Sequence, residues 1–238
     1  MSHNNYFRFK QFRIDQNHAA MRVGTDGVLL GAWTELGSVQ SILDIGTGTG
    51  VITLMLAQRS TAIIDAIDID TGAIQDATCN FEQSPWKNRL TATQISLQEF
   101  SGSTQKRYDC IVSNPPFFTS AQKPKQNNRL MARHTDSLSF DDLLKNVGSL
   151  LLPHGKFSVV LPAEEEHAFQ HQAGKYRLFL TRIIRVKPNP EKPITRVLME
   201  FQKEGKLISE NELTLETTTR HEYTKTAIEL LKPFYLYL

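Results

Sequence analysis

The chain has 238 residues, of which 40% are hydrophobic and 22% are charged, and its formal net charge is +2 at pH 7. This composition is that of a folded globular protein, and it excludes disordered and fibrous chains. The cysteines, Cys79 and Cys110, support neither a disulfide framework nor a zinc site. The N-terminus is polar, and no apolar run is as long as a membrane span, which needs about eighteen residues. We therefore expect a cytoplasmic protein without a membrane segment.

The first segment, at about residues 1–24, interleaves aromatic and basic residues and reads as an extension before the main fold. Such alternation is typical of a strand with one aromatic face. It is also the composition of a nucleic-acid contact, in which rings stack on bases and cations meet phosphates. The second interpretation assigns Arg8, Lys10 and Phe12 to RNA binding.

A helix is then predicted with Thr25 or Asp26 as its N-cap and an end near Gly37. The amides of its first turn are suited to a ligand carboxylate, which makes Thr25 a candidate binding residue.

An apolar strand at residues 41–45 runs directly into Gly46-Thr47-Gly48-Thr49-Gly50 and a helix at 51–59. Glycines at such a turn let the backbone approach a nucleoside closely. The spacing differs from that of the dinucleotide fingerprint, which weakens a nicotinamide or flavin interpretation. The next strand, 63–68, ends in Asp68, where a carboxylate can accept both ribose hydroxyls. Asp70 or Thr71 is expected to cap the helix that follows.

A third strand is predicted at residues 90–95, and we expect the turn at Ser96 and Leu97 to meet the base of the cofactor. The fourth strand, 109–113, ends at Asn114-Pro115-Pro116-Phe117. The prolines cannot donate to a strand ladder, and the residue before a proline is kept extended. The Asn114 side chain is therefore held stiffly at the carboxyl end of a strand, where ligands bind in open α/β sheets.

Two interpretations of this tetrapeptide are open. The Asn114 side-chain oxygen and the Pro115 carbonyl can accept the two hydrogens of one planar NH2 group, with the Phe117 ring against the attached π-system. Alternatively, the stretch is a Pro-Pro turn with core phenylalanines.

Between residues 118 and 138 the sequence predicts a loop that is rich in bases and lacks acids over most of its length. It is either a solvated loop or a positively charged flap that follows phosphates. Its candidate RNA contacts are Lys123, Lys125, Arg129 and Arg133.

The last third predicts helices at 140–152 and 164–175, a strand at 156–161 and two antiparallel strands at 177–186 and 194–201. Seven bases and one acid lie between Lys175 and Arg196, which makes Arg185 and Lys187 candidate RNA contacts. A weak strand at 213–215 and a helix near Ala227 complete the chain. The pattern predicts a single α/β domain over residues 1–238, with a doubly wound, mostly parallel seven-stranded sheet and a terminal antiparallel hairpin.

The combination of Asp44 with the glycine turn, then Asp68, then Asn114-Pro115-Pro116-Phe117 resembles class I S-adenosylmethionine-dependent methyltransferases that modify planar NH2 groups. More narrowly, Phe9-Lys10-Gln11-Phe12 and the stretch from Arg22 to Trp33 resemble the bacterial tRNA-valine adenine-37 N6-methyltransferase family.

That resemblance implies S-adenosylmethionine as cofactor, tRNA as partner, no metal, and methyl transfer to N6 of the adenosine beside the anticodon. It implies a cofactor site at Thr25, Asp44, Gly46, Gly48, Gly50, Asp68, Ser96 and Leu97. Two positions depart from the pattern: Ser96 stands where many relatives of the wider class have an acid, and Arg22 where the family often has lysine. Alternative functions are methylation of guanine N2 in rRNA or of glutamine N5 in a protein, and noncatalytic RNA binding.

Overall fold

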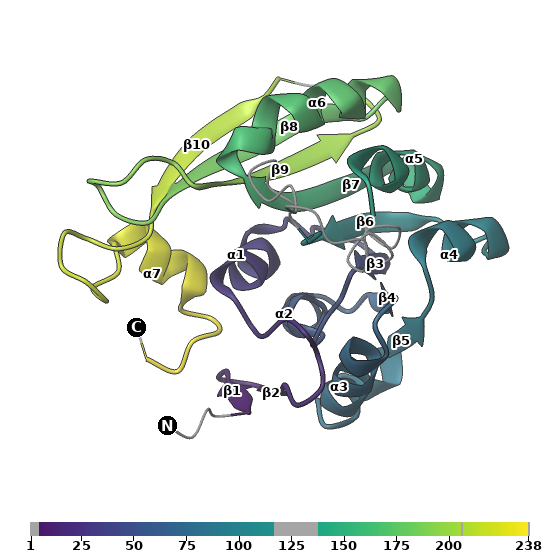
Figure 1. The fold of residues 1–238 in the computed structure, drawn as a ribbon, viewed down its shortest axis with the longest axis horizontal. Coiled ribbons are helices and arrows are strands. Elements are labelled where there is room, and N and C mark those ends of the chain that lie inside the picture. Colours follow the sequence, from purple (N-terminus) through teal and green to yellow (C-terminus); the bar gives the residue numbers. More distant parts are fainter. Residues whose placement is uncertain (1–4, 117–137, 206, 238) are drawn as a thin grey trace, which may run out of the picture.

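A computed structural model describes residues 5–116, 138–205 and 207–237. At its centre lies an eight-stranded sheet with the strand order β10-β8-β9-β7-β6-β3-β4-β5 (Figure 1). A separate antiparallel hairpin of β1 (Tyr6–Arg8) and β2 (Arg13–Asp15) lies near the N-terminus.

Five neighbouring strands form the parallel part of the sheet. They are β3 (Ser41–Ile45), β4 (Ile63–Asp68), β5 (Leu90–Gln94), β6 (Tyr108–Ser113) and β7 (Leu151–Pro162). Because all five run the same way, their carboxyl ends meet at one edge of the sheet.

The other part of the sheet reverses direction. β9 (Arg196–Gln202) lies antiparallel between β7 and β8 (Phe179–Lys187), as the sequence predicts for the last two long strands. β10 (Ser209–Thr214) then adds in parallel to β8 and raises the sheet to eight strands, one more than predicted.

Two hydrophobic cores cover the two faces of the sheet. One contains residues of α1, α2, α3 and α7, and the other contains residues of α4, α5 and α6 (Figure 1). Neighbouring residues of a strand point to opposite faces, so that Ile42 enters the first core and Leu43 the second. The helices are α1 (Thr25–Trp33), α2 (Val51–Arg59), α3 (Thr71–Glu82), α4 (Leu97–Ser103), α5 (Phe140–Leu150), α6 (Glu166–Lys175) and α7 (Lys225–Leu231).

Two boundaries differ from the sequence prediction. α1 has Gly24 as its N-cap and ends at Trp33, whereas Thr25 or Asp26 and Gly37 were expected. β7 begins at Leu151, so residues 153–155, between the predicted helix and the predicted strand, lie inside it. The β6–β7 register shifts there, from Tyr108 opposite Leu151 to Cys110 opposite Lys156, and the strand absorbs the proline at this irregularity.

Candidate active site

A cleft of about 1100 Å³ opens at the carboxyl edge of the parallel strands. Its wall includes the ends of β3, β4 and β6, the first turn of α1 and the turn before α4. The sequence-predicted residues that line it are Thr25, Gly46, Gly48, Asp68, Ser96, Leu97, Asn114, Pro115 and Pro116. The fold thus brings together residues that are up to about ninety positions apart in the chain.

The glycine turn forms the floor of the cleft. Gly48 has a φ of 55°, and nothing lies within 4 Å of the place where a Cβ atom would be, so the backbone faces open space. Gly50 has a φ of 81° and a different constraint, because a Cβ there would lie 2.5 Å from the Phe81 ring. Gly48 therefore leaves room for a ligand, whereas Gly50 allows the turn to pack on α3.

Asp68 lies at the end of β4 and is tied to the glycine turn. Its Oδ2 accepts from the Gly48 N–H at 2.9 Å, and its Oδ1 accepts from the Asp70 N–H at 3.0 Å. Asp70 caps α3 by accepting from the Ala73 N–H at 2.7 Å, which confirms the predicted cap. These bonds fix the Asp68 carboxylate at the lining of the cleft.

Asp44 is completely buried beneath the turn. Its Oδ2 accepts from the hydroxyls of Thr47 at 2.8 Å and Thr53 at 2.7 Å, while Oδ1 has no partner among the described residues. Burial raises the pKa of Asp44 to about 6; the two hydroxyls oppose this shift, and the charge of Asp68 adds to it. A buried carboxylate that has hydroxyl donors but no positively charged partner, and that lies next to a cleft, is suited to a cationic ligand.

Ser96 and Leu97, at the start of α4, are the residues predicted to adjoin the base of the cofactor. Ser96 caps α4 and forms a capping box with Glu99, and its Oγ donates to Glu99 Oε2 at 2.7 Å. Leu97 is buried at 4% exposure but still contributes to the cleft wall. The contact of this pair with the adenine of a cofactor stays a prediction.

Asn114 follows β6 directly and is half-buried, with Pro115 buried and Pro116 exposed behind it. A Cβ atom on Gly27 would lie 3.8 Å from the Asn114 Nδ2, so the amide stands next to the first turn of α1. Phe117 lies outside the described residues, as do Lys123, Lys125, Arg129 and Arg133.

Thr25 is the first residue of α1 and lines the cleft beside Asp26. Asp26 is anchored to the antiparallel part of the sheet, because its Oδ2 accepts from the Nε of Arg196 at 2.8 Å. The first turn of α1 is thereby held against β9, in a position facing the cleft.

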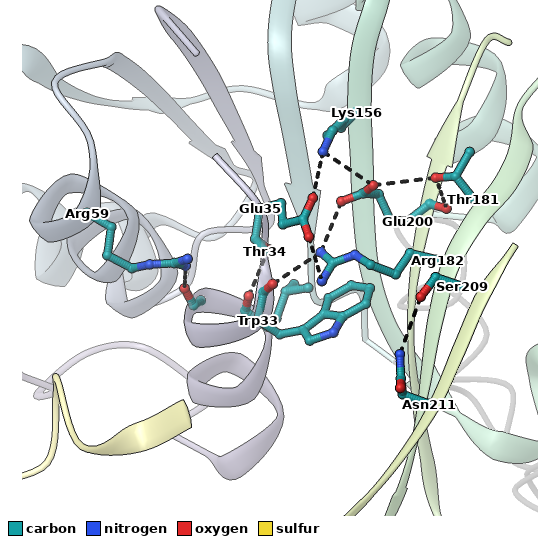
Figure 2. A network of polar contacts seen from close by, with 12 residues as sticks. Trp33, Thr34, Glu35, Arg59, Lys156, Thr181, Arg182, Glu200, Ser209 and Asn211 are labelled. Atoms are coloured by element: carbon teal, nitrogen blue, oxygen red, sulfur yellow. Dashed lines mark hydrogen bonds and ion pairs between the residues drawn. The ribbon is translucent and has the colours of Figure 1, made fainter. Parts of the chain in front are cut away.

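The other end of α1 is fixed by a network of charges (Figure 2). The Arg182 guanidinium stacks on the Trp33 ring at 3.8 Å from its centroid and donates to Glu200 at 3.0 Å. Lys156 pairs with Glu35 at 2.9 Å and with Glu200 at 3.6 Å. The network holds the helix onto β7, β8 and β9, and it lies outside the cleft.

The predicted RNA contacts separate into two groups. Arg8 and Lys10 are exposed on and beside the N-terminal hairpin, where Lys10 Nζ donates to the Lys232 carbonyl at 2.6 Å. The prediction that Phe12 contacts RNA requires a correction. Phe12 is only 7% exposed, stacks on Phe9 with ring centroids 4.5 Å apart and meets the Trp86 ring edge-on. Its ring belongs to the core and is not available for stacking on a base.

Arg185 and Lys187 require a second correction. Arg185 pairs with Glu166 at 2.5 Å and with Glu210 at 2.9 Å, and Lys187 pairs with Glu212 at 2.8 Å. Acids from α6 and β10 thus neutralise the charges that looked unbalanced in the sequence, and this strand is not a basic surface.

Sequence reasoning missed two apolar residues at the rim of the cleft. Ile69 and Met21 line it and are 53% and 60% exposed. The position of Ile69 directly after the candidate ribose-binding acid is a signal that could have found it. No local signal marks Met21, because its segment reaches the cleft only through the tertiary fold.

The cleft fits S-adenosylmethionine, which carries a sulfonium and an ammonium charge. Five acids and two cations are among the described residues that line it: Asp26, Asp68, Asp70, Glu99, Asp142, Arg22 and Arg196. An acidic excess, the open glycine turn and the unpaired Oδ1 of Asp44 all suit a cationic nucleoside.

Across residues 5–116, 138–205 and 207–237, no group of three or more His, Cys, Asp or Glu side chains is placed to hold a metal ion. In the same ranges, no helix is long and apolar enough to cross a membrane.

Comparison with known proteins places the chain among methyltransferases. The family model of the methyltransferase small domain matches residues 20–166. A tRNA1(Val) (adenine(37)-N6)-methyltransferase from Trichodesmium erythraeum is 48% identical over 98% of both chains. One from Flavobacterium psychrophilum is 45% identical over 97% of this chain and 99% of its own. A solved structure of a predicted O-methyltransferase from Agrobacterium tumefaciens shares the fold, with a TM-score of 0.69 and 16% identity over 88% of this chain and 96% of that one.

The sheet order, the glycine turn and the cleft at the carboxyl edge define a class I S-adenosylmethionine-dependent methyltransferase. The chain belongs to the family of bacterial tRNA1(Val) (adenine(37)-N6)-methyltransferases, as the extent and degree of identity show.

Proposed function

We propose that the protein transfers the methyl group of S-adenosylmethionine to N6 of adenine 37 in tRNA1(Val). The observation that carries the proposal is the position of Asn114 and Pro115, which line the same cleft as the glycine turn and Asp68. This arrangement occurs in a chain that is 42–48% identical, over nearly its full length, to relatives named for this reaction. We place the reaction in the cytoplasm and the whole chain in one domain.

The cofactor, when bound, supplies an electrophilic methyl group on a sulfonium sulfur. Asp68 accepts the ribose hydroxyls, the glycine turn and the first turn of α1 receive the methionine part, and Ser96 and Leu97 adjoin the adenine. The acidic wall favours the sulfonium and ammonium groups of this ligand.

Asn114 and Pro115 orient the target amine. An aryl amine is a weak nucleophile because its lone pair is delocalised into the ring. When the Asn114 side-chain oxygen and the Pro115 carbonyl accept its two N–H groups, the nitrogen lone pair is directed at the methyl group. The N–C bond forms as the C–S bond breaks, and the nitrogen then loses one proton to water. Positioning contributes most of the acceleration.

The target adenine has to leave its stack before it can enter the cleft. Unstacking costs a few kcal/mol, and this cost is lowest in a loop such as the anticodon loop. We assign Phe117 to the face of the flipped base. Arg8, Lys10 and the bases of the 118–138 segment are assigned to the RNA backbone.

Methyl transfer from labelled S-adenosylmethionine tests the proposal. We expect label in total tRNA and not in rRNA or protein, with N6-methyladenosine as the labelled nucleoside after digestion. A tRNA1(Val) transcript should accept one methyl group, whereas the same transcript with guanosine at position 37 should accept none. Label in guanosine of rRNA or in glutamine would instead support one of the alternative substrates.

A further inference from the structure

Residues 16–24, here called the strap, have no regular secondary structure. The strap connects β2 of the N-terminal hairpin to α1, and on its way it passes beside α3 (Figure 1). It lines the cleft with Ala19, Ala20, Met21, Arg22 and Gly24. A segment with no ladder or helix of its own needs other contacts to hold its path.

One row of α3 faces the start of the strap. Gly72, Asp76 and Asn80 are spaced four residues apart, which places them on one face of the helix. Asp76 is only 2% exposed, and its carboxylate accepts from the N–H groups of His18 at 2.9 Å and Ala19 at 2.8 Å. The ring Nδ1 of His18 lies 2.8 Å from its other oxygen.

Asn80 is 1% exposed, and its side chain makes three hydrogen bonds to two separate stretches of backbone. Its Oδ1 accepts from the Asp15 N–H at 2.8 Å, and its Nδ2 donates to the Asp15 carbonyl at 2.9 Å. The same Nδ2 donates to the carbonyl of Thr49, in the glycine turn, at 2.9 Å. One amide thus connects the residue before the strap with the floor of the cofactor site.

Gly72 allows the strap to lie directly on the helix. A Cβ atom at this position would be 2.5 Å from the His18 carbonyl oxygen, closer than real contacts permit. The three residues of the row therefore contact mainly the backbone of residues 15–19. Such contacts fix the path of a segment and do not depend on its side chains.

We propose that Gly72, Asp76 and Asn80 are positioning residues that hold the strap as one wall of the cofactor cleft. None of the three lines the cleft, so they act through the strap and the glycine turn. The inference rests on the proposed function only in taking S-adenosylmethionine as the ligand of the cleft. Loss of this row should weaken cofactor binding while the chemical step at Asn114 proceeds normally.

Asp76→Asn tests the proposal, with Asp109→Asn as its matched control. Asp109 has nearly the same partners, because it accepts from the N–H groups of Gln40 and Ser41, both at 3.0 Å, and lies 3.1 Å from the His154 ring. It stands at the start of β6, at the opposite edge of the sheet, and does not line the cleft. Both substitutions place an amide NH2 group among N–H donors, so both should lower the melting temperature.

Calorimetry with S-adenosylhomocysteine, in the absence of RNA, separates the two variants. We expect Asp76→Asn to raise the dissociation constant about tenfold and Asp109→Asn to change it less than about twofold. With tRNA and S-adenosylmethionine both saturating, kcat of Asp76→Asn should stay within about threefold of the wild type. Gly72→Ala should weaken binding in the same direction without removing any hydrogen-bonding group, and it keeps the test informative if Asp76→Asn does not fold.

Unchanged affinity in both Asp76→Asn and Gly72→Ala would overturn the inference, since the row would then contribute stability alone. An equal loss of affinity in Asp109→Asn would overturn it as well. A protein that shows the expected pattern of binding but methylates no tRNA would refute the proposed function and leave the role of the row intact.

Discussion

Two buried carboxylates, Asp44 beneath the glycine turn and Glu200 in β9, have opposite surroundings. Glu200 is 2% exposed and meets two cations, Arg182 at 3.0 Å and Lys156 at 3.6 Å. Asp44 is fully buried, meets two hydroxyls and no cation, and leaves Oδ1 without a partner among the described residues.

The difference separates scaffold from site. A buried charge that is paired inside the fold holds elements together. In Figure 2, Glu200 of β9 pairs with Arg182 of β8, which also donates to the Trp33 carbonyl of α1. A buried carboxylate without a cation is destabilising for the protein alone, and we expect a positively charged ligand in the adjoining cleft to offset this cost. Substitutions in the network should therefore change stability, and substitutions at the cleft should change binding or rate.

The largest effect is expected at the network. Arg182→Ala leaves Glu200 buried with a weaker set of partners, and we expect it to lower the free energy of unfolding by about 3 kcal/mol. Urea unfolding measures this loss. Lys187→Ala, which removes a more exposed pair with Glu212, should cost less than about 1 kcal/mol. A weakened affinity of folded Arg182→Ala for S-adenosylhomocysteine would contradict the separation.

At the cleft, Asn114→Ala should reduce the single-turnover rate of methylation by about 100-fold, or about 2.7 kcal/mol, as for the loss of one positioned polar group. Its melting temperature and its affinity for S-adenosylhomocysteine should not change. Asn114→Asp still accepts from an NH2 group and should keep part of the activity. If Asn114 only shapes the Pro-Pro turn, Asn114→Ala would lose stability and methylate at a normal rate.

The third substitution, Asp68→Ala, concerns cofactor affinity. Losing hydrogen bonds to a charged acceptor costs about 1.5 to 3 kcal/mol, so we expect the dissociation constant of S-adenosylhomocysteine to rise by about one to two orders of magnitude. Calorimetry measures it, and tRNA binding should change less. Asp109→Asn is the control, since Asp109 lies at the opposite edge of the sheet and does not line the cleft, and it should leave the affinity near that of the wild type. Equal affinities of Asp68→Ala and the wild type would remove Asp68 from the site.

The smallest effect is a pH dependence at Asp44. Its pKa is about 6 in the folded protein, against the ordinary 3.8 of an unfolded chain. The group therefore stabilises the ligand-free fold fully below about pH 4, and this contribution is lost as the pH rises through 6. The ammonium group of S-adenosylhomocysteine favours the ionised form of Asp44, so the affinity for this ligand should fall about tenfold from pH 7 to pH 5.

Asp44→Asn provides the comparison for this profile. An amide has no charge to titrate, so the variant should bind S-adenosylhomocysteine more weakly at pH 7 and with little change down to pH 5. As the pH rises from 4 to 6, the free energy of unfolding of the variant should fall less than that of the wild type. The same pH profile in both proteins would assign the dependence to another group.

Much of the candidate site could be predicted from sequence because its signals are local. The glycine turn, Asp68 and Asn114 each follow a short apolar strand, and parallel strands bring their carboxyl ends to one edge. Arg185 and Lys187 were predicted to form a basic surface for RNA, but acids from other elements neutralise both side chains. Counting charges along the chain cannot detect acids that arrive from β10, which pairs with β8 from a distant segment.

The sequence by itself determined the order of strands and helices and the residues at the carboxyl edge, because periodicity and turn residues act over short distances. The class of chemistry came from the resemblance of its motifs to those of methyltransferases. Only the tertiary structure decided that Phe12 lies in the core, that Arg182 joins α1 to the sheet, and that Gly72, Asp76 and Asn80 contact the backbone of residues 15–19. Each of these depends on which segments pack together, and the energy of such contacts is set by partners far apart in the chain.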